Sequence, residues 1–112
     1  MAQRDTDFLQ GTLELLVLKA LSLQPMHGWG VAQRIQQLSR DVLRVGQGSL
    51  YPALYRLEDR GWIRSTWATS DHNRRARYYT LTRAGWARLG SETAGWERYA
   101  GAVGAVLRTE AV

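Results

Sequence analysis

The sequence predicts a mainly α-helical fold of the α+β class, in which three helices precede a β-hairpin and a long last helix. Apolar residues recur at helical spacing over three stretches, residues 9–23, 29–39 and 49–60. Two-residue alternation replaces this spacing over residues 63–67 and 77–81, which is typical of paired strands. A helical pattern with one narrow apolar seam then occupies residues 83–108.

The first helix is predicted from about residue 9 or 12 to residue 23. Its apolar residues cover most of its circumference, which indicates burial against the domain core on one side and against a second subunit on the other. Residues 24–28 are predicted to form a turn, and a second helix follows over about residues 29–39. Its core stripe is Val31, Ala32, Ile35 and Leu38. Residues 40–45 are predicted to be a connector, with a short strand at residues 42–45 as an alternative.

The third helix has predicted ends and two different faces. Ser49 is its expected N-cap, Pro52 falls in the first turn, and Gly61 ends the helix in a left-handed conformation. The helical spacing buries Leu50, Ala53, Leu54 and Leu57. Tyr51, Tyr55 and Arg56 lie on other faces, where two exposed tyrosines beside an arginine suit contact with phosphates and base edges.

After the third helix, the hairpin carries Arg74 and Arg75 at its tip. Thr82 is the expected N-cap of the last helix, whose seam has near-heptad spacing and therefore requires a partner helix. This order of elements predicts a winged helix-turn-helix domain over residues 1–81 and a dimerisation helix over residues 82–112. The third helix would enter the major groove of DNA, and the hairpin would lie along the adjacent backbone or minor groove.

Composition favours a nucleic-acid partner. The net charge is +5, and the basic residues are 14 arginines with one lysine among the 112 residues. Cysteine is absent, which excludes disulfides and thiol chemistry and fits a cytoplasmic protein. The longest apolar run is far too short to span a membrane. With two histidines and no cysteine we expect no metal site and no cofactor.

The candidate residues fall into three sets. DNA contact is predicted for Ser49, Tyr51, Tyr55, Arg56, His72, Asn73, Arg74, Arg75 and Arg77. Gly28 and Gly30 either meet a phosphate through their backbone amides or permit a tight turn with close helix packing. The predicted dimer interface consists of Leu13, Leu16, Leu89, Trp96, Ala100, Val103 and Leu107.

Three separated blocks of the sequence resemble the PadR family of bacterial transcriptional regulators. They are GTLELLVL at residues 11–18 with HGWG at 27–30, GSLYPAL at 48–54 with LEDRGWI at 57–63, and RYYTLT at 77–82 with Gly85. The family usually has tyrosine where this chain has Trp29. The resemblance, over residues 9–96, implies a homodimer that binds an inverted-repeat operator and usually represses. The single C-terminal helix is similar to that of the smaller members. In these the first and last helices form the dimer interface, where in some members a small apolar molecule binds and changes DNA affinity.

The sequence is also compatible with other functions. Trp96 is either an interface anchor, which we favour, or a surface on which a small aromatic or cationic effector stacks. The domain could instead be a winged-helix protein-interaction module. An enzyme is not expected, because no glycine-rich phosphate loop follows a strand and the adjacent Glu58 and Asp59 do not face one another on a helix.

Overall fold

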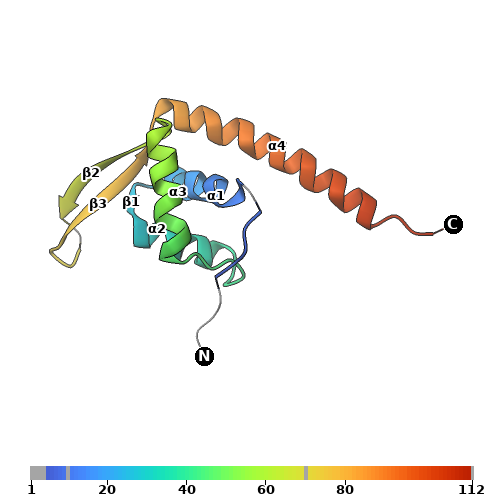
Figure 1. Ribbon diagram of the computed structural model, residues 1–112, viewed down its shortest axis with the longest axis horizontal. Coiled ribbons are helices and arrows are strands. Elements are labelled where there is room, and N and C mark those ends of the chain that lie inside the picture. The colour runs from blue at the N-terminus through green and yellow to red at the C-terminus, as the bar shows by residue number, and fades with distance from the viewer. Residues whose placement is uncertain (1–4, 10, 70, 112) are drawn as a thin grey trace.

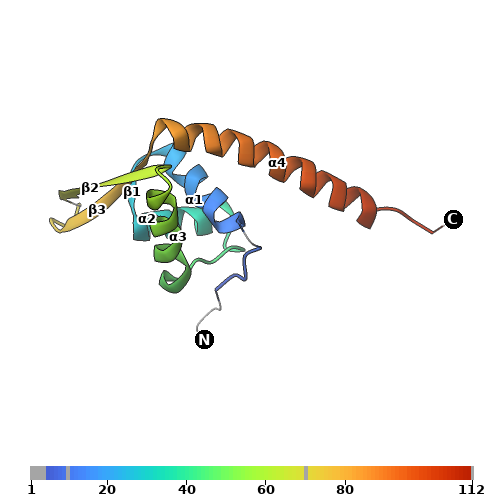
Figure 2. The same ribbon diagram turned by 45° about the horizontal axis from the view of Figure 1, so that its top comes forward.

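The computed structural model describes residues 5–9, 11–69 and 71–111, and it confirms the predicted order of the four helices and the hairpin (Figure 1). The elements are α1 (Thr12–Leu23), β1 (Met26–His27), α2 (Gly28–Leu38), α3 (Gln47–Asp59), β2 (Ile63–Thr69), β3 (Arg75–Leu81) and α4 (Arg83–Leu107). Helices α1, α2 and α3 form a cluster, the sheet projects from one side of it, and α4 extends away on the other. Figure 2 shows the same separation from a second direction.

One apolar core joins the three helices to the base of the hairpin. The predicted stripe of α3 is confirmed, because Leu50, Ala53, Leu54 and Leu57 are each at most 2% exposed. They pack with residues of α1, α2, β2 and β3, including Val17, Leu18, Val31, Ile35, Ile63 and Leu81. Leu38 was expected in this core, and that prediction is wrong because it is 58% exposed. It is the last residue of α2, where the chain turns away through Arg40 and Asp41 at positive φ.

Helix α3 ends as predicted but begins earlier than predicted. Gly61 has a φ of +77°, the Gly61 amide donates to the Glu58 carbonyl, and the Trp62 amide donates to the Leu57 carbonyl. This pair of bonds is a Schellman motif, which only a left-handed residue such as glycine closes without strain. The N-cap is Gly46 rather than Ser49, because the amides of Ser49 and Leu50 both donate to the Gly46 carbonyl.

The early start of α3 changes the position of its proline. Pro52 lies inside the helix, beyond the first turn, so the prediction that it falls in the first turn is wrong. A proline there removes one intrahelical amide donor and strains the preceding turn. The helix persists because its buried stripe packs in the core on both sides of Pro52.

The sheet contains one strand that the sequence did not predict. Its order is β1-β3-β2, with β2 antiparallel to β3 from Ile63↔Leu81 to Thr69↔Arg75. The segment predicted as a turn contributes β1, in which Met26 pairs with Tyr79 and His27 with Tyr78. The alternative strand at residues 42–45 is wrong. In that segment the Arg44 amide donates to Thr6 Oγ1 at 2.7 Å and the Thr6 amide donates to the Arg44 carbonyl at 2.9 Å, without regular pairing.

Helix α4 starts where the sequence predicts and packs on the domain by its first turns. The Thr82 side chain accepts a hydrogen bond from the Gly85 amide at 3.1 Å, which confirms the predicted N-cap. Gly85 and Leu89 are its buried residues. Within the residues that the structure describes, no helix is long and apolar enough to cross a membrane.

Candidate nucleic-acid interface

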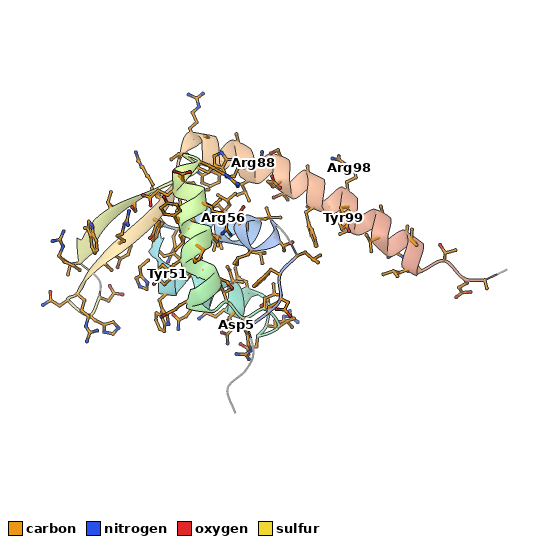
Figure 3. The ribbon with its side chains drawn as sticks, viewed as in Figure 1. Asp5, Tyr51, Arg56, Arg88, Arg98 and Tyr99 are labelled. Carbon is orange, nitrogen blue, oxygen red and sulfur yellow. The ribbon has the colours of Figure 1, made fainter. Side chains whose placement is uncertain are left out.

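The outer face of α3 presents two tyrosines to solvent. Tyr51 is 46% exposed and Tyr55 is 72% exposed, and they lie one helical turn apart on the side away from the buried stripe. Their predicted exposure is confirmed. Figure 3 shows Tyr51 on the edge of α3 nearest the sheet, whereas Arg56 lies on the edge nearest α1. A protruding helix with this exposed ridge fits the width of a major groove.

A groove of about 1010 Å³ lies between α2 and the outer part of the hairpin, and Tyr51 of α3 also lines it. Tyr51 contributes to one wall, and basic side chains contribute to the other. Its lining includes Trp29, Gln33, Arg34, Tyr51, His72, Arg74, Arg75 and Arg77. The groove therefore brings together five of the residues predicted to contact DNA, with cations and aromatic rings facing the same space.

Trp29 and Arg34 are among the α2 residues that line this groove and were not predicted as contact residues. Trp29 is 58% exposed, and its ring stacks on His27 with centroids 6.3 Å apart. The Nε atom of Arg34 is buried and has no hydrogen-bond partner among the described residues. A general rule could have pointed to these residues, because in helix-turn-helix proteins the helix before the recognition helix crosses the DNA backbone.

The tip of the hairpin is basic and exposed. His72, Asn73 and Arg74 lie in the exposed turn, and Asn73 adopts a φ of +59° that tightens it. Arg75 is the first residue of β3, and its guanidinium carbon lies 5.3 Å from the centroid of the Trp67 ring. Trp67 is itself 60% exposed. The tip thus presents two neighbouring arginines, one of them supported from below by an aromatic ring.

The predicted contact residue Arg56 is bound within the chain. Its Nε donates to Glu14 Oε1 at 2.5 Å, and Arg60 Nη1 lies 3.4 Å from Glu14 Oε2. Glu14 is on α1, so these pairs join α3 to α1 along the edge opposite Tyr51. Ser49 is exposed and lines the cleft on this same side, near Arg56. The structure therefore does not place Ser49 and Arg56 in the groove that contains Tyr51 and the hairpin arginines.

Arg77 is also engaged within the chain. Its guanidinium bonds to Glu58 on α3 and to Ser65 on β2, and its carbon lies 5.9 Å from the Tyr79 ring centroid. Burial raises the pKa of the Tyr79 hydroxyl above its ordinary value of 10.0; Arg77 lowers that pKa in part, whereas Glu58 and Tyr51 raise it further. Tyr79 is therefore a neutral phenol at physiological pH, buried next to the ion pair of Arg77 and Glu58.

The two glycines at the start of α2 have structural roles. The Gly30 amide donates to His27 Nδ1 at 3.0 Å, so His27 caps α2 and occupies an amide that a phosphate would need. A Cβ on Gly28 would lie 3.1 Å from Tyr51 Cε1 and 3.3 Å from Leu54 Cδ1. These contacts favour close helix packing over phosphate binding, and they place Gly28 directly behind the exposed tyrosine.

The predicted dimer residues divide into two groups. Leu13 and Leu89 are buried inside the chain at 8% and 9% exposure, and Leu16 is half-buried against the same core. Trp96, Val103 and Leu107 are 40%, 40% and 78% exposed on α4, with Ala100 half-buried between them. Trp96 lies beside Tyr99, with ring centroids 6.4 Å apart. The described part of the chain contains no cluster of three or more His, Cys, Asp or Glu side chains that could hold a metal ion.

Comparison with known proteins identifies relatives of this arrangement. The transcriptional regulator PadR-like family matches residues 17–91. The fold is similar to a PadR-like transcriptional regulator from Bacillus cereus, with a TM-score of 0.80, 25% identity, and coverage of 94% of this chain and 100% of the other. It is also similar to a PadR family transcriptional regulator from Eggerthella lenta, with a TM-score of 0.74, 30% identity, and coverage of 90% and 86%.

A curated relative of unknown function is closer in sequence but much longer. An uncharacterised 37.1 kDa protein in a transposon of Streptomyces fradiae is 38% identical over 90 residues. The match covers 80% of this chain and 24% of that protein, so the chain spans about a quarter of its length. The matching family is a family of transcriptional regulators.

Proposed function

Because the chain belongs to the PadR-like family of transcriptional regulators, we propose that it is a homodimeric repressor that binds an inverted-repeat operator. The observation that carries this proposal is the groove that exposed Tyr51 of α3 lines together with Arg74 and Arg75 of the hairpin. Solvent alone gives no reason to combine exposed rings and guanidinium groups on one concave surface. DNA does, because it offers base edges and phosphates together.

The proposed mechanism is steric. Helix α3 would place Tyr51 and Tyr55 against base edges in the major groove, while Arg74 and Arg75 bind backbone phosphates beside it. Two copies would read half-sites about 34 Å apart, one turn of the duplex, and so occlude a promoter. Such a protein acts in the cytoplasm, where bacterial DNA lies.

The dimer would form through residues 82–112, chiefly through the exposed seam of α4. Trp96, Ala100, Val103 and Leu107 would pack against a second copy, and Leu16 would add the exposed part of α1. Trp96 would anchor this interface. A small aromatic or cationic effector that stacks on Trp96 would change the separation of the two α3 helices and release the operator.

The test of this proposal is DNA binding measured by fluorescence anisotropy on the region upstream of the gene and on a random duplex of equal length. We expect preference for the upstream region and a linear fall of log affinity with log salt. Arg74→Ala with Arg75→Ala should reduce that slope by up to about 1.8, since each phosphate contact contributes about 0.9. The matched control is Arg98→Ala with Arg108→Ala, which removes the same charge from α4 and its C-cap and should change the slope much less.

The second candidate function, a protein-interaction module, gives the opposite result. In that case the hairpin variant would bind DNA as weakly as the parent, and neither duplex would be preferred.

The effector is tested separately by quenching of tryptophan emission with N-methylquinolinium in the absence of DNA. Trp96→Leu should abolish the saturable part of the quenching, and Trp29→Leu should retain it.

A further inference from the structure

Three elements meet at one polar cluster formed by Glu58 of α3, Ser65 of β2 and Arg77 of β3. Arg77 Nη2 lies 3.2 Å from Glu58 Oε1 and 3.3 Å from Glu58 Oε2. Arg77 also donates to Ser65 Oγ, through Nε at 3.0 Å and through Nη2 at 2.6 Å. Ser65 Oγ in turn donates to Glu58 Oε2 at 2.6 Å. Each residue thus binds both of the others.

The hydrogen-bonding capacity of this cluster is used in full at its centre. A serine hydroxyl has one donor and two acceptor sites, and all three are occupied on Ser65. The Tyr79 ring supports the Arg77 guanidinium from the sheet side. An arginine whose only role is to bind DNA would not require a hydroxyl and a carboxylate arranged around it in this way.

The position of the cluster in the sheet explains what it can do. Strand β1 pairs with β3 only at Tyr78 and Tyr79, so the hairpin beyond Arg77 is a two-stranded ribbon. A two-stranded ribbon is only marginally stable by itself. Going along β3 from its paired segment toward the hairpin tip, Arg77 is the first residue that no longer lies opposite β1. Its bonds to Glu58 attach the ribbon to α3 at the point where the ribbon begins to protrude.

We propose that Arg77 is a positioning residue, which fixes the angle between the hairpin and α3 through Glu58 and Ser65, and that it does not contact phosphate. This inference rests on the proposed function and changes the role predicted for Arg77. It separates Arg77 from Arg75, two residues along the same strand and on the same face. Arg75 would bind the duplex, whereas Arg77 sets where Arg75 lies relative to Tyr51.

The two possible roles of Arg77 predict different effects of Glu58→Gln on DNA binding. If Glu58 merely restrained a phosphate-binding arginine, Glu58→Gln would free the guanidinium, remove a negative charge near DNA, and raise affinity for any duplex. If the cluster positions the hairpin, Glu58→Gln lowers the ratio of operator affinity to random-duplex affinity. Ser65→Ala lowers the same ratio without any change of charge.

The DNA experiment uses the duplex that the parent protein selects from a random pool, with a random duplex as reference. We expect Ser65→Ala and Glu58→Gln each to reduce the affinity ratio about threefold to tenfold, the range for a partly exposed ion pair with its hydrogen bonds. Glu58→Gln with Arg77→Gln should lose no more than either single variant. Arg75→Gln is the control, and it should reduce the salt slope by about 0.9. An equal rise on both duplexes with Glu58→Gln overturns the proposal.

A second measurement tests the same inference in the free protein. In Ser65→Ala, the hairpin amides between Arg77 and the tip should exchange hydrogen about threefold to tenfold faster, relative to the amides of Tyr79 and Leu81. Unchanged exchange refutes the positioning role whatever the DNA result. If exchange accelerates but the parent protein prefers no duplex, the proposed function fails while the cluster keeps its role in fixing the hairpin.

Discussion

The two halves of α4 have the same sequence spacing but opposite surroundings. In the inner half, residues 83–92, Gly85 and Leu89 are buried and Arg88 lies over the Trp62 ring with its guanidinium carbon 4.5 Å from the centroid. In the outer half, residues 93–107, Trp96, Val103 and Leu107 are all exposed. Figure 1 shows this half running away from the rest of the chain.

We infer from this difference that the seam packs on the chain's own domain in its inner half and on a second partner in its outer half. The inner half packs on the chain's own domain, whereas the outer half has apolar side chains that remain 40–78% exposed, among them Trp96, Val103 and Leu107. Gly95, Gly101 and Gly104 each weaken the outer helix by about 1 kcal/mol relative to alanine. A helix of this composition needs packing to persist, and a second α4 is the simplest source of it.

The largest expected effect comes from charging the outer half. Val103→Asp with Leu107→Asp should raise the dissociation constant of the proposed dimer at least about a hundredfold, because an unpaired charge in an apolar contact costs about 3 kcal/mol or more. The measurement is sedimentation equilibrium over a range of concentrations. The control is Ala105→Asp on the opposite side of the helix, which should leave the mass unchanged. If the double variant kept the mass of a dimer, the assembly would use another surface.

The inner half is tested by a pair of glycine substitutions with opposite expected signs. A Cβ on Gly85 would lie 1.9 Å from the Trp62 carbonyl oxygen, and a backbone atom cannot move aside easily. Gly85→Ala should therefore destabilise the fold by about 2 kcal/mol. Gly90, five residues later, has nothing within 4 Å of such a Cβ, so Gly90→Ala should stabilise by about 0.5–1 kcal/mol. Urea denaturation at one fixed subunit concentration measures both, since dimerisation contributes to stability.

Local signals in the sequence predicted most of the fold. The stripe of α3, the left-handed end at Gly61 and the cap at Thr82 depend on residues within one or two helical turns, and all three are confirmed. The exposure of Tyr51 and Tyr55 follows from the same stripe. The start of α3 was missed because Ser49 is the better cap by residue preference, while the chain already turns at Gly46.

Contacts between distant residues explain what the sequence did not predict. Arg56 pairs with Glu14 across 42 positions and Arg77 with Glu58 across 19, so no periodicity could show that these arginines are engaged. Strand β1 is only two residues long and exists because β3 offers a free edge. The seam of α4 was predicted as one surface, because spacing alone cannot show where the helix leaves its own domain.

The smallest expected effect compares one arginine from each half of α4. Arg88 stacks on Trp62 and pairs with Glu92 one turn away, so Arg88→Ala should destabilise the fold by about 1 kcal/mol. Arg98 points away from α4 in Figure 3 and belongs to the outer half, and Arg98→Ala should change stability by less than about 0.5 kcal/mol. Both variants are measured by urea denaturation under the same conditions as Gly85→Ala and Gly90→Ala. If both variants lost the same free energy of unfolding, the outer half would contribute as much to the stability of the fold as the inner half. The inferred division of the seam between two partners would then be wrong.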